Sequence, residues 1–249
     1  MKLSRIFFVC IAFVMVSCQP KTDQQKLKSL EVLPDSTVIK RIFKPDGKLF
    51  AEILRKKGMK NGLSKNFYEN GEVEIETNYV NDRKEGETKL YYPGGKICKR
   101  LIYKNDLRNG IEEHYYKNGK IACQIPYLNG EVEPGLLEYN SDGVLFMNNP
   151  SIVVTPIDKI ATKNKYILQL TLSNHSKSVA FKRVYFKNEK KTTEEIKTQD
   201  GIGNLSFDVN PGKVLYGKII LEASYETIYG NLYVTRTTYN LVIGRKANK

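Results

Sequence analysis

Apolar and polar residues alternate along most of the chain, and short turn-forming sequences interrupt this alternation at regular intervals. In EVEIETNYV, residues 72–80, every second side chain is on the same side of an extended backbone. Such segments are six to eight residues long and are bounded by Gly, Asn and Asp, as is typical of antiparallel strands. The pattern predicts an all-β protein.

One sequence phrase recurs with a period of 24 residues. It contains an aromatic residue, a glycine four places later and an apolar residue two places after the glycine. Fixed-interval repetition is typical of stacked structural units. We expect each unit to contain two antiparallel strands and two turns, which gives a meander of about ten strands over 37–147. The repeated turn glycines are Gly47, Gly71, Gly95, Gly119 and Gly143.

The residue before each repeated glycine is Asp, Asn or Gly. These dipeptides favour a type I′ hairpin turn, in which both central residues have positive φ. The polar sequences NDRKEG and NDLRNG, which lie between the repeated glycines, are expected to form looser turns.

Two rows of aromatic residues accompany the repeat. Successive side chains of a strand point to opposite faces, so the two rows are expected on opposite faces of the sheet. The first row is Phe43, Phe67, Tyr91, Tyr115 and Tyr139, and the second is Tyr68, Tyr92 and Tyr116. We interpret the second row as a candidate partner-binding surface. The alternative is that both rows pack along the sheet and against the C-terminal domain.

The phrase Tyr-Tyr-x-Asn-Gly-Lys-Ile, followed by Tyr-x-Asn and Gly, resembles the MORN repeat in its antitoxin-like bacterial variant. The likeness is strongest in 91–110 and 115–130 and extends over roughly 42–147. It implies an elongated sheet used for binding, and it does not imply catalysis. The antitoxin-like variant also implies an alternative function, neutralisation of a toxin by an antitoxin or immunity protein.

The pattern changes after Asn149-Pro150, and residues 148–249 form a second predicted domain. Five alternating segments are expected as strands: 165–173, 179–187, 204–209, 214–226 and 232–243. NHSKS, KNEKKTTEE, NPGK and YGN are expected to separate them. About seven strands in this length favour an immunoglobulin-like β-sandwich, although the Cys and Trp typical of antibody domains are absent.

The first residues have the features of a bacterial export signal. Lys2 and Arg5 precede the apolar run 6–16, which is too short to span a bilayer. Met15-Val16-Ser17-Cys18 resembles a lipobox, which implies a lipoprotein signal peptide at 1–17 and acylation of Cys18 with diacylglycerol and palmitate. Residues 18–36 are then a tether. We expect this anchor to hold the protein in the outer membrane, and we favour the periplasmic side over the cell surface. The alternative to a lipoprotein signal is an ordinary signal peptide.

The formal net charge is +13. A basic excess can favour acidic lipids, acidic proteins or nucleic acid, or it can reflect solvated strand faces. Export removes nucleic acid as a partner. The basic run 55–65 could contact anionic lipid, although a solvated turn is the simpler interpretation.

No residue pattern indicates catalysis, a metal site, a cofactor or a small-molecule substrate. His114 and His175 are the only histidines and show no ligand-like spacing. Cys98 and Cys123 are expected on opposite faces, two strand spacings apart, so both should be free thiols. We therefore expect a non-catalytic, lipid-anchored binding or scaffold protein with an unidentified envelope protein as partner. An envelope hydrolase with a site hidden from sequence is the remaining alternative.

Overall fold

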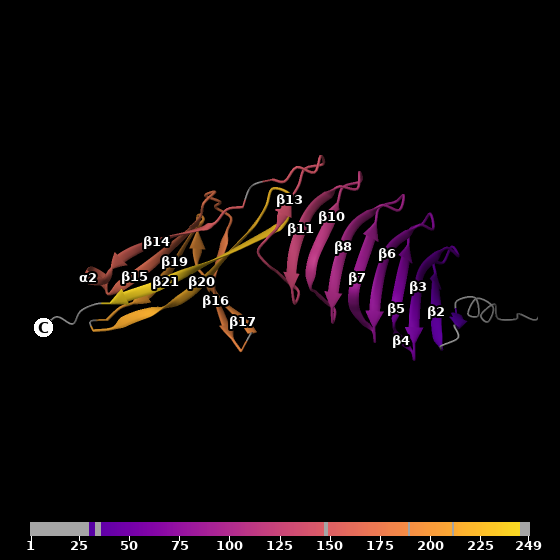
Figure 1. Cartoon of the computed structure of the whole chain (residues 1–249), viewed down its shortest axis with the longest axis horizontal. Coiled ribbons are helices and arrows are strands. Elements are labelled where there is room, and N and C mark those ends of the chain that lie inside the picture. Colours follow the sequence, from indigo (N-terminus) through magenta and orange to yellow (C-terminus); the bar gives the residue numbers. More distant parts are fainter. Residues whose placement is uncertain (1–29, 33–35, 147–148, 189, 211, 245–249) are drawn as a thin grey trace, which may run out of the picture.

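The computed structural model describes residues 30–32, 36–146, 149–188, 190–210 and 212–244, and it confirms the all-β prediction (Figure 1). The predicted signal peptide 1–17, Cys18 and most of the tether 18–36 lie outside the described residues. The one described helix is α2, Ile160–Lys163.

The repeats form one antiparallel meander of 13 strands. Each long strand pairs with the next one along the chain, in the order β1-β2-β3-β5-β6-β7-β8-β10-β11-β12, while β4, β9 and β13 pair with β3, β8 and β11. Figure 1 shows these strands stacked side by side along the long axis of the molecule. The strands are β1 (Leu30–Val32), β2 (Thr37–Phe43), β3 (Leu49–Lys56), β4 (Met59–Lys60), β5 (Gly62–Phe67), β6 (Val73–Val80), β7 (Arg83–Tyr91), β8 (Ile97–Lys104), β9 (Leu107–Arg108), β10 (Gly110–Tyr115), β11 (Ile121–Leu128), β12 (Glu131–Val132) and β13 (Leu137–Glu138).

The predicted turn type at the repeated glycines is wrong. At Gly71, the backbone N–H donates to the Tyr68 carbonyl (3.0 Å) and the Tyr68 N–H donates to the Glu72 carbonyl (2.8 Å). This geometry closes a three-residue loop in which Gly71 has φ of 85° while Asn70 keeps a negative φ. It corresponds to a type I turn followed by a glycine bulge.

The type I′ turns lie at the opposite ends of the strands, where looser turns were expected. Val80 pairs with Arg83, and the two residues between them have positive φ, 49° at Asn81 and 67° at Asp82. The Asp82 carboxylate also accepts a 2.8 Å hydrogen bond from the Lys60 N–H of the preceding repeat. Asn and Asp tolerate the left-handed conformation, and here the Asp also links neighbouring repeats.

Residues beyond Pro150 form two four-stranded sheets that share one core. One sheet has the order β14-β15-β19-β18 and the other β17-β16-β20-β21, which matches the A-B-E-D and C′-C-F-G arrangement of immunoglobulin-like sandwiches. The largest fully buried side chains include Leu168, Leu170, Phe181 and Leu221. The strands are β14 (Ile152–Lys159), β15 (Lys165–Leu172), β16 (Ala180–Lys187), β17 (Lys190–Ile196), β18 (Thr198–Gln199), β19 (Ile202–Asp208), β20 (Val214–Glu226) and β21 (Leu232–Gly244).

Most of the predicted separator KNEKKTTEE is in fact strand β17. Its side chains are mostly exposed, because β17 is an edge strand that pairs with β16 alone. Charged residues on an edge strand discourage pairing with other chains. Because these side chains are charged, the hydrophobicity pattern of the sequence did not indicate a strand here.

The sandwich contacts the last repeat directly. Tyr233 of β21 packs with Cys123, Ile125 and Leu136 in a small buried cluster. Arg236, also on β21, makes paired hydrogen bonds to Glu133, one of them 2.9 Å long, and its Nε donates to Glu222 at 2.7 Å. These contacts join the sandwich to the end of the repeat sheet.

A polar groove on the repeat sheet

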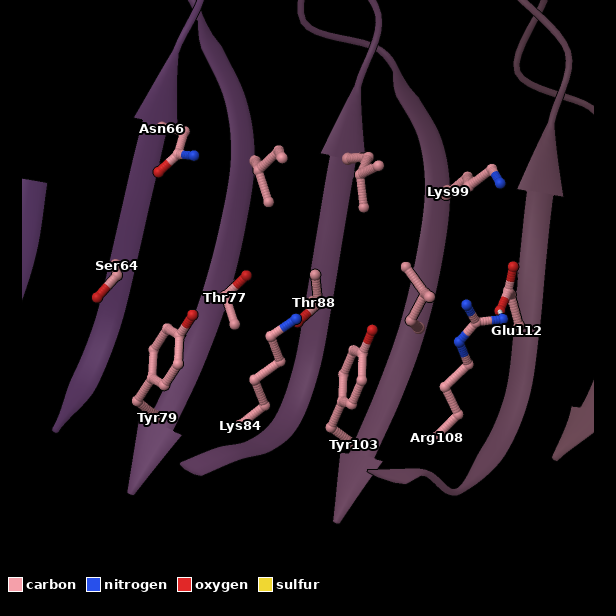
Figure 2. Close-up of a pocket in the computed structure, with 13 residues that line it drawn as sticks. Ser64, Asn66, Thr77, Tyr79, Lys84, Thr88, Lys99, Tyr103, Arg108 and Glu112 are labelled. Carbon is pink, nitrogen blue, oxygen red and sulfur yellow. Dashed lines mark hydrogen bonds and ion pairs between the residues drawn. The ribbon is translucent and has the colours of Figure 1, made fainter. Parts of the chain in front are cut away.

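The two faces of the repeat sheet differ in how their charges are arranged. On one face, cross-strand pairs neutralise each other, as in Arg41–Glu52 (2.8 Å) and Lys65–Glu76 (3.0 Å). We call this the ion-pair face. The other face carries a groove of about 400 Å³, which we call the groove face. In Figure 2 the groove runs across β5, β6, β7, β8 and β10.

A row of three hydroxyl side chains lies in the middle of the groove. Ser64 pairs with Thr77, and Thr77 pairs with Thr88, so the three point to the same face on neighbouring strands. They are only 8%, 7% and 5% exposed. The Ser64 Oγ and the Thr88 Oγ1 are buried without a hydrogen-bond partner among the described residues. Buried polar atoms are usually satisfied, so these two oxygens are exceptional.

Thr77 also departs from the repeat. Equivalent positions 24 residues apart hold Ile53, Leu101 and Ile125. An aliphatic side chain is therefore the normal residue at this position, and the polar row exists only where Thr77 replaces it. Repeat stacking alone does not explain that substitution.

Alternating cations and tyrosines border the hydroxyl row. The Lys60 ammonium lies 4.6 Å from the Tyr79 ring centroid, and the Lys84 ammonium lies 4.8 Å from that of Tyr103. Arg108 repeats the contact over Tyr127 at 4.9 Å. Figure 2 shows the hydroxyls of Tyr79 and Tyr103 pointing toward the row, with Lys84 between the two rings. The 24-residue period thus generates a cation–π ladder along the groove.

At one end of the groove, Glu112 is buried in a network of polar side chains. Its two oxygens contact His114 Nε2 (2.6 Å) and Arg108 Nη1 (3.0 Å), and Arg108 also donates to the Tyr127 hydroxyl (2.7 Å). Burial alone would raise the pKa of Glu112, but the His114 hydrogen bond and the Arg108 charge outweigh burial and lower this pKa. His114 therefore has a carboxylate partner on its own strand, although no such partner was expected from its spacing in the sequence. The i, i+2 spacing of Glu112 and His114 on one strand was the signal that could have revealed the pair.

The predicted partner-binding tyrosines lie outside the groove and are half-buried. The hydroxyls of Tyr68, Tyr92 and Tyr116 each donate to a backbone carbonyl one repeat further on, at Tyr91, Tyr115 and Tyr139. This arrangement gives them a role in connecting repeats, and their role in partner binding stays a prediction. The repeated turn glycines lie at the strand ends, with φ between 78° and 89°.

Cys98 and Cys123 are both free, as predicted. They lie on β8 and β11, with β10 between them. Cys123 is buried and Cys98 is half-buried. Burial, with a smaller effect of Glu138, raises the pKa of the Cys123 thiol to about 11.

The part of the chain that the structure describes has no cluster of metal-binding side chains and no helix that could span a membrane. No cluster of three or more His, Cys, Asp or Glu side chains in this part has metal-binding geometry. Its only helix is far shorter than a bilayer-crossing helix.

Comparison with known proteins identifies the units that line the groove. Residues 60–81, 84–105 and 108–129 match the MORN repeat variant. The three consecutive matches contribute the Lys60, Lys84 and Arg108 cations of the ladder. The outer copies at 43–49 and 139–145 are not matched, although their strands belong to the same sheet or bridge beside it.

The other comparisons give little beyond this. No curated protein matches the chain. Among solved structures, eight chains match; one, "Crystal Structure of TarM", shares 18% sequence identity at a TM-score of 0.30. That match covers 44% of this chain and 22% of the TarM chain.

Proposed function

We propose that this protein is a non-catalytic binding protein of the bacterial cell envelope and that it holds a protein partner on the groove face of its MORN repeats. MORN repeats suggest a binding or scaffold role. The observation that carries the proposal is the groove itself, where the hydroxyls of Ser64 and Thr88 have no hydrogen-bond partner, and Lys84 no paired carboxylate, among the described residues. A purely structural sheet has no need of these features.

The contrast between the two faces supports this choice of surface. On the ion-pair face, Arg100 contacts both Glu87 (3.7 Å) and Glu113 (2.5 Å), so most of the charge is used internally. On the groove face, Lys84 and Lys99 form no ion pair with any described residue. Unpaired cations beside a concave surface favour an acidic partner.

The sandwich is proposed to hold the sheet in a fixed orientation relative to the partner. Its β21 contributes both an apolar contact, through Tyr233, and a charged contact, through Arg236, to the last repeat. A sheet fixed at one end loses less freedom on binding, which favours affinity.

The location in the envelope is proposed from the sequence of the first 18 residues. Cleavage before Cys18 and acylation of its sulfur would anchor the chain in the outer membrane, with the periplasmic side favoured. Metabolic labelling with a palmitate analogue tests this directly: label is expected on the intact chain and absent from a Cys18→Ala variant. Label on both, or on neither, contradicts the anchor.

Cross-linking in intact membranes, followed by mass spectrometry, tests the binding function. We expect one envelope protein to be recovered reproducibly through residues 60–129. Recovery of no protein above the background of a deletion strain would reject the proposal. Conversion of a substrate by the purified protein, lost when Glu112 is replaced, would instead indicate an enzyme.

A further inference from the structure

The hydroxyl row and the cation beside it form a compact site with its own chemistry. Ser64, Thr77 and Thr88 lie on three adjacent strands, and their Cβ atoms are separated by about 5 Å at each step. The oxygens can donate as well as accept hydrogen bonds. Lys84 adds an ammonium group with three donors and no paired carboxylate among the described residues.

The hydroxyl row and Lys84 together offer more hydrogen-bond donors than the groove offers acceptors. Among the described residues, Glu112 is the only acidic one that lines the groove, and its oxygens are already used by Arg108 and His114. A ligand that enters the row must therefore bring acceptors and negative charge. Its negative charge would compensate Lys84, and its oxygens would satisfy the buried hydroxyls of Ser64 and Thr88.

The surrounding backbone favours a carboxylate over a phosphate. Phosphate sites typically use free backbone N–H groups from helix ends or nests. Here the residues of the row sit inside paired strands, whose N–H groups bond within the sheet. One ammonium and a few hydroxyls match the single charge and the two oxygens of a carboxylate.

We propose that the row of Ser64, Thr77 and Thr88, together with Lys84, is a receptor for an acidic side chain of the partner. The partner presents a Glu or Asp carboxylate from an acid-rich segment that follows the cation–π ladder. The Lys60, Lys84 and Arg108 cations recur every two strands, about 10 Å apart, and so extend the positive potential along the groove. This inference rests on the proposed function and names the partner's chemistry.

Threonine methyl NMR tests the site with a minimal probe. The probe is a capped tripeptide with one central Glu, and its control is the same peptide with Gln. We expect the Glu peptide to shift the methyl resonances of Thr77 and Thr88 in a saturable manner, with affinity about tenfold above that of the Gln peptide. The absence of a saturable shift would overturn the inference, as would equal affinity for the two peptides.

Two lysines of β7 that point to opposite faces of the sheet provide a control for net charge. Lys84→Met and Lys89→Met each remove one cation from β7, but Lys89 carries its charge 2.9 Å from Glu87. Binding of the Glu peptide should weaken about tenfold in Lys84→Met and remain unchanged in Lys89→Met. Equal losses would show that long-range charge alone attracts the peptide and would overturn the site.

Thr88→Val separates binding from folding. The variant keeps the shape of the side chain and removes an unpaired hydroxyl, so its melting temperature should be unchanged or higher while the Thr77 methyl no longer responds to the peptide. A lower melting temperature would assign the hydroxyl to structure. Inorganic phosphate that binds more tightly than the Glu peptide would contradict the carboxylate assignment.

The outcomes also separate this inference from the proposed function. If the Thr88→Val and Lys84→Met proteins still cross-link to the partner, the proposed binding function stands and the carboxylate site is rejected. A Glu peptide that binds the row while membranes yield no partner supports the site and rejects the protein-binding role.

Discussion

The Tyr92 hydroxyl donates a 2.7 Å hydrogen bond to the backbone carbonyl of Tyr115, which lies one repeat further along the chain. Tyr116 makes the same contact with the carbonyl of Tyr139. Each such bond satisfies a carbonyl at the end of a strand and fixes the spacing between repeats. The tyrosine after the strand is therefore part of the repeat architecture.

Replacing this tyrosine by phenylalanine should weaken the stack. Tyr92→Phe leaves the Tyr115 carbonyl without its donor, and the free energy of unfolding should fall by about 1 kcal/mol. Urea denaturation followed by tyrosine fluorescence measures the change. Tyr103→Phe is the matched control, since the Tyr103 hydroxyl has no hydrogen bond to another described residue; equal losses in the two variants would contradict the assigned role.

A branched side chain at Gly95 is expected to destabilise the protein because of the backbone conformation there, and not because of a steric clash. A Cβ at Gly95 would meet no atom within 4 Å, but φ there is 78°. Gly95→Val should therefore lower the free energy of unfolding by about 1–2 kcal/mol, and Gly95→Asn by less. Thermal denaturation of both variants checks this order. An unchanged melting temperature for Gly95→Val would be incompatible with the left-handed turn.

The two thiols should differ in reactivity. Burial raises the pKa of Cys123 to about 11, so its thiolate is scarce at pH 8, and burial also raises the pKa of the more accessible Cys98. In native protein that lacks residues 1–18, and therefore Cys10 and Cys18, a thiol reagent should modify Cys98 first and Cys123 slowly. After denaturation without reductant, two thiols should react; a count of zero would reveal a disulfide.

The charged contact between the sandwich and the last repeat should weaken in acid. The Arg236 hydrogen bonds lower the pKa of Glu133 despite its partial burial. Its contribution to stability is therefore present above the usual Glu pKa of about 4.3 and is lost as the pH falls through the lowered value.

A Glu133→Gln variant isolates this contribution. At pH 7 the variant should unfold about 1–3 kcal/mol more easily than the parent protein, because Arg236 loses a charged partner. The difference should shrink as the pH falls through the lowered pKa of Glu133, because the carboxyl is then protonated in the folded protein as well. A pH-independent difference would show that the charge has no role.

The repeat period predicted the meander because each unit carries its own turns and strands. It placed the type I′ turn at the wrong end of the strands, since Asn and Asp suit both kinds of hairpin end. Aligning the copies could have revealed Thr77 among aliphatic residues. The groove itself required the strand register, because only register places Ser64, Thr77 and Thr88 on one face. The strand β17 was missed because its exposed, charged side chains resemble a loop.

The most direct test of the groove as the binding face is a pair of photo-cross-linkers on one strand. Tyr79 and Glu76 both lie on β6, but Tyr79 lines the groove and Glu76 pairs with Lys65 on the ion-pair face. A photoreactive phenylalanine at position 79 should capture the envelope partner in living cells, and the same residue at position 76 should not. Capture from position 76 alone, or equally from both positions, would contradict the account.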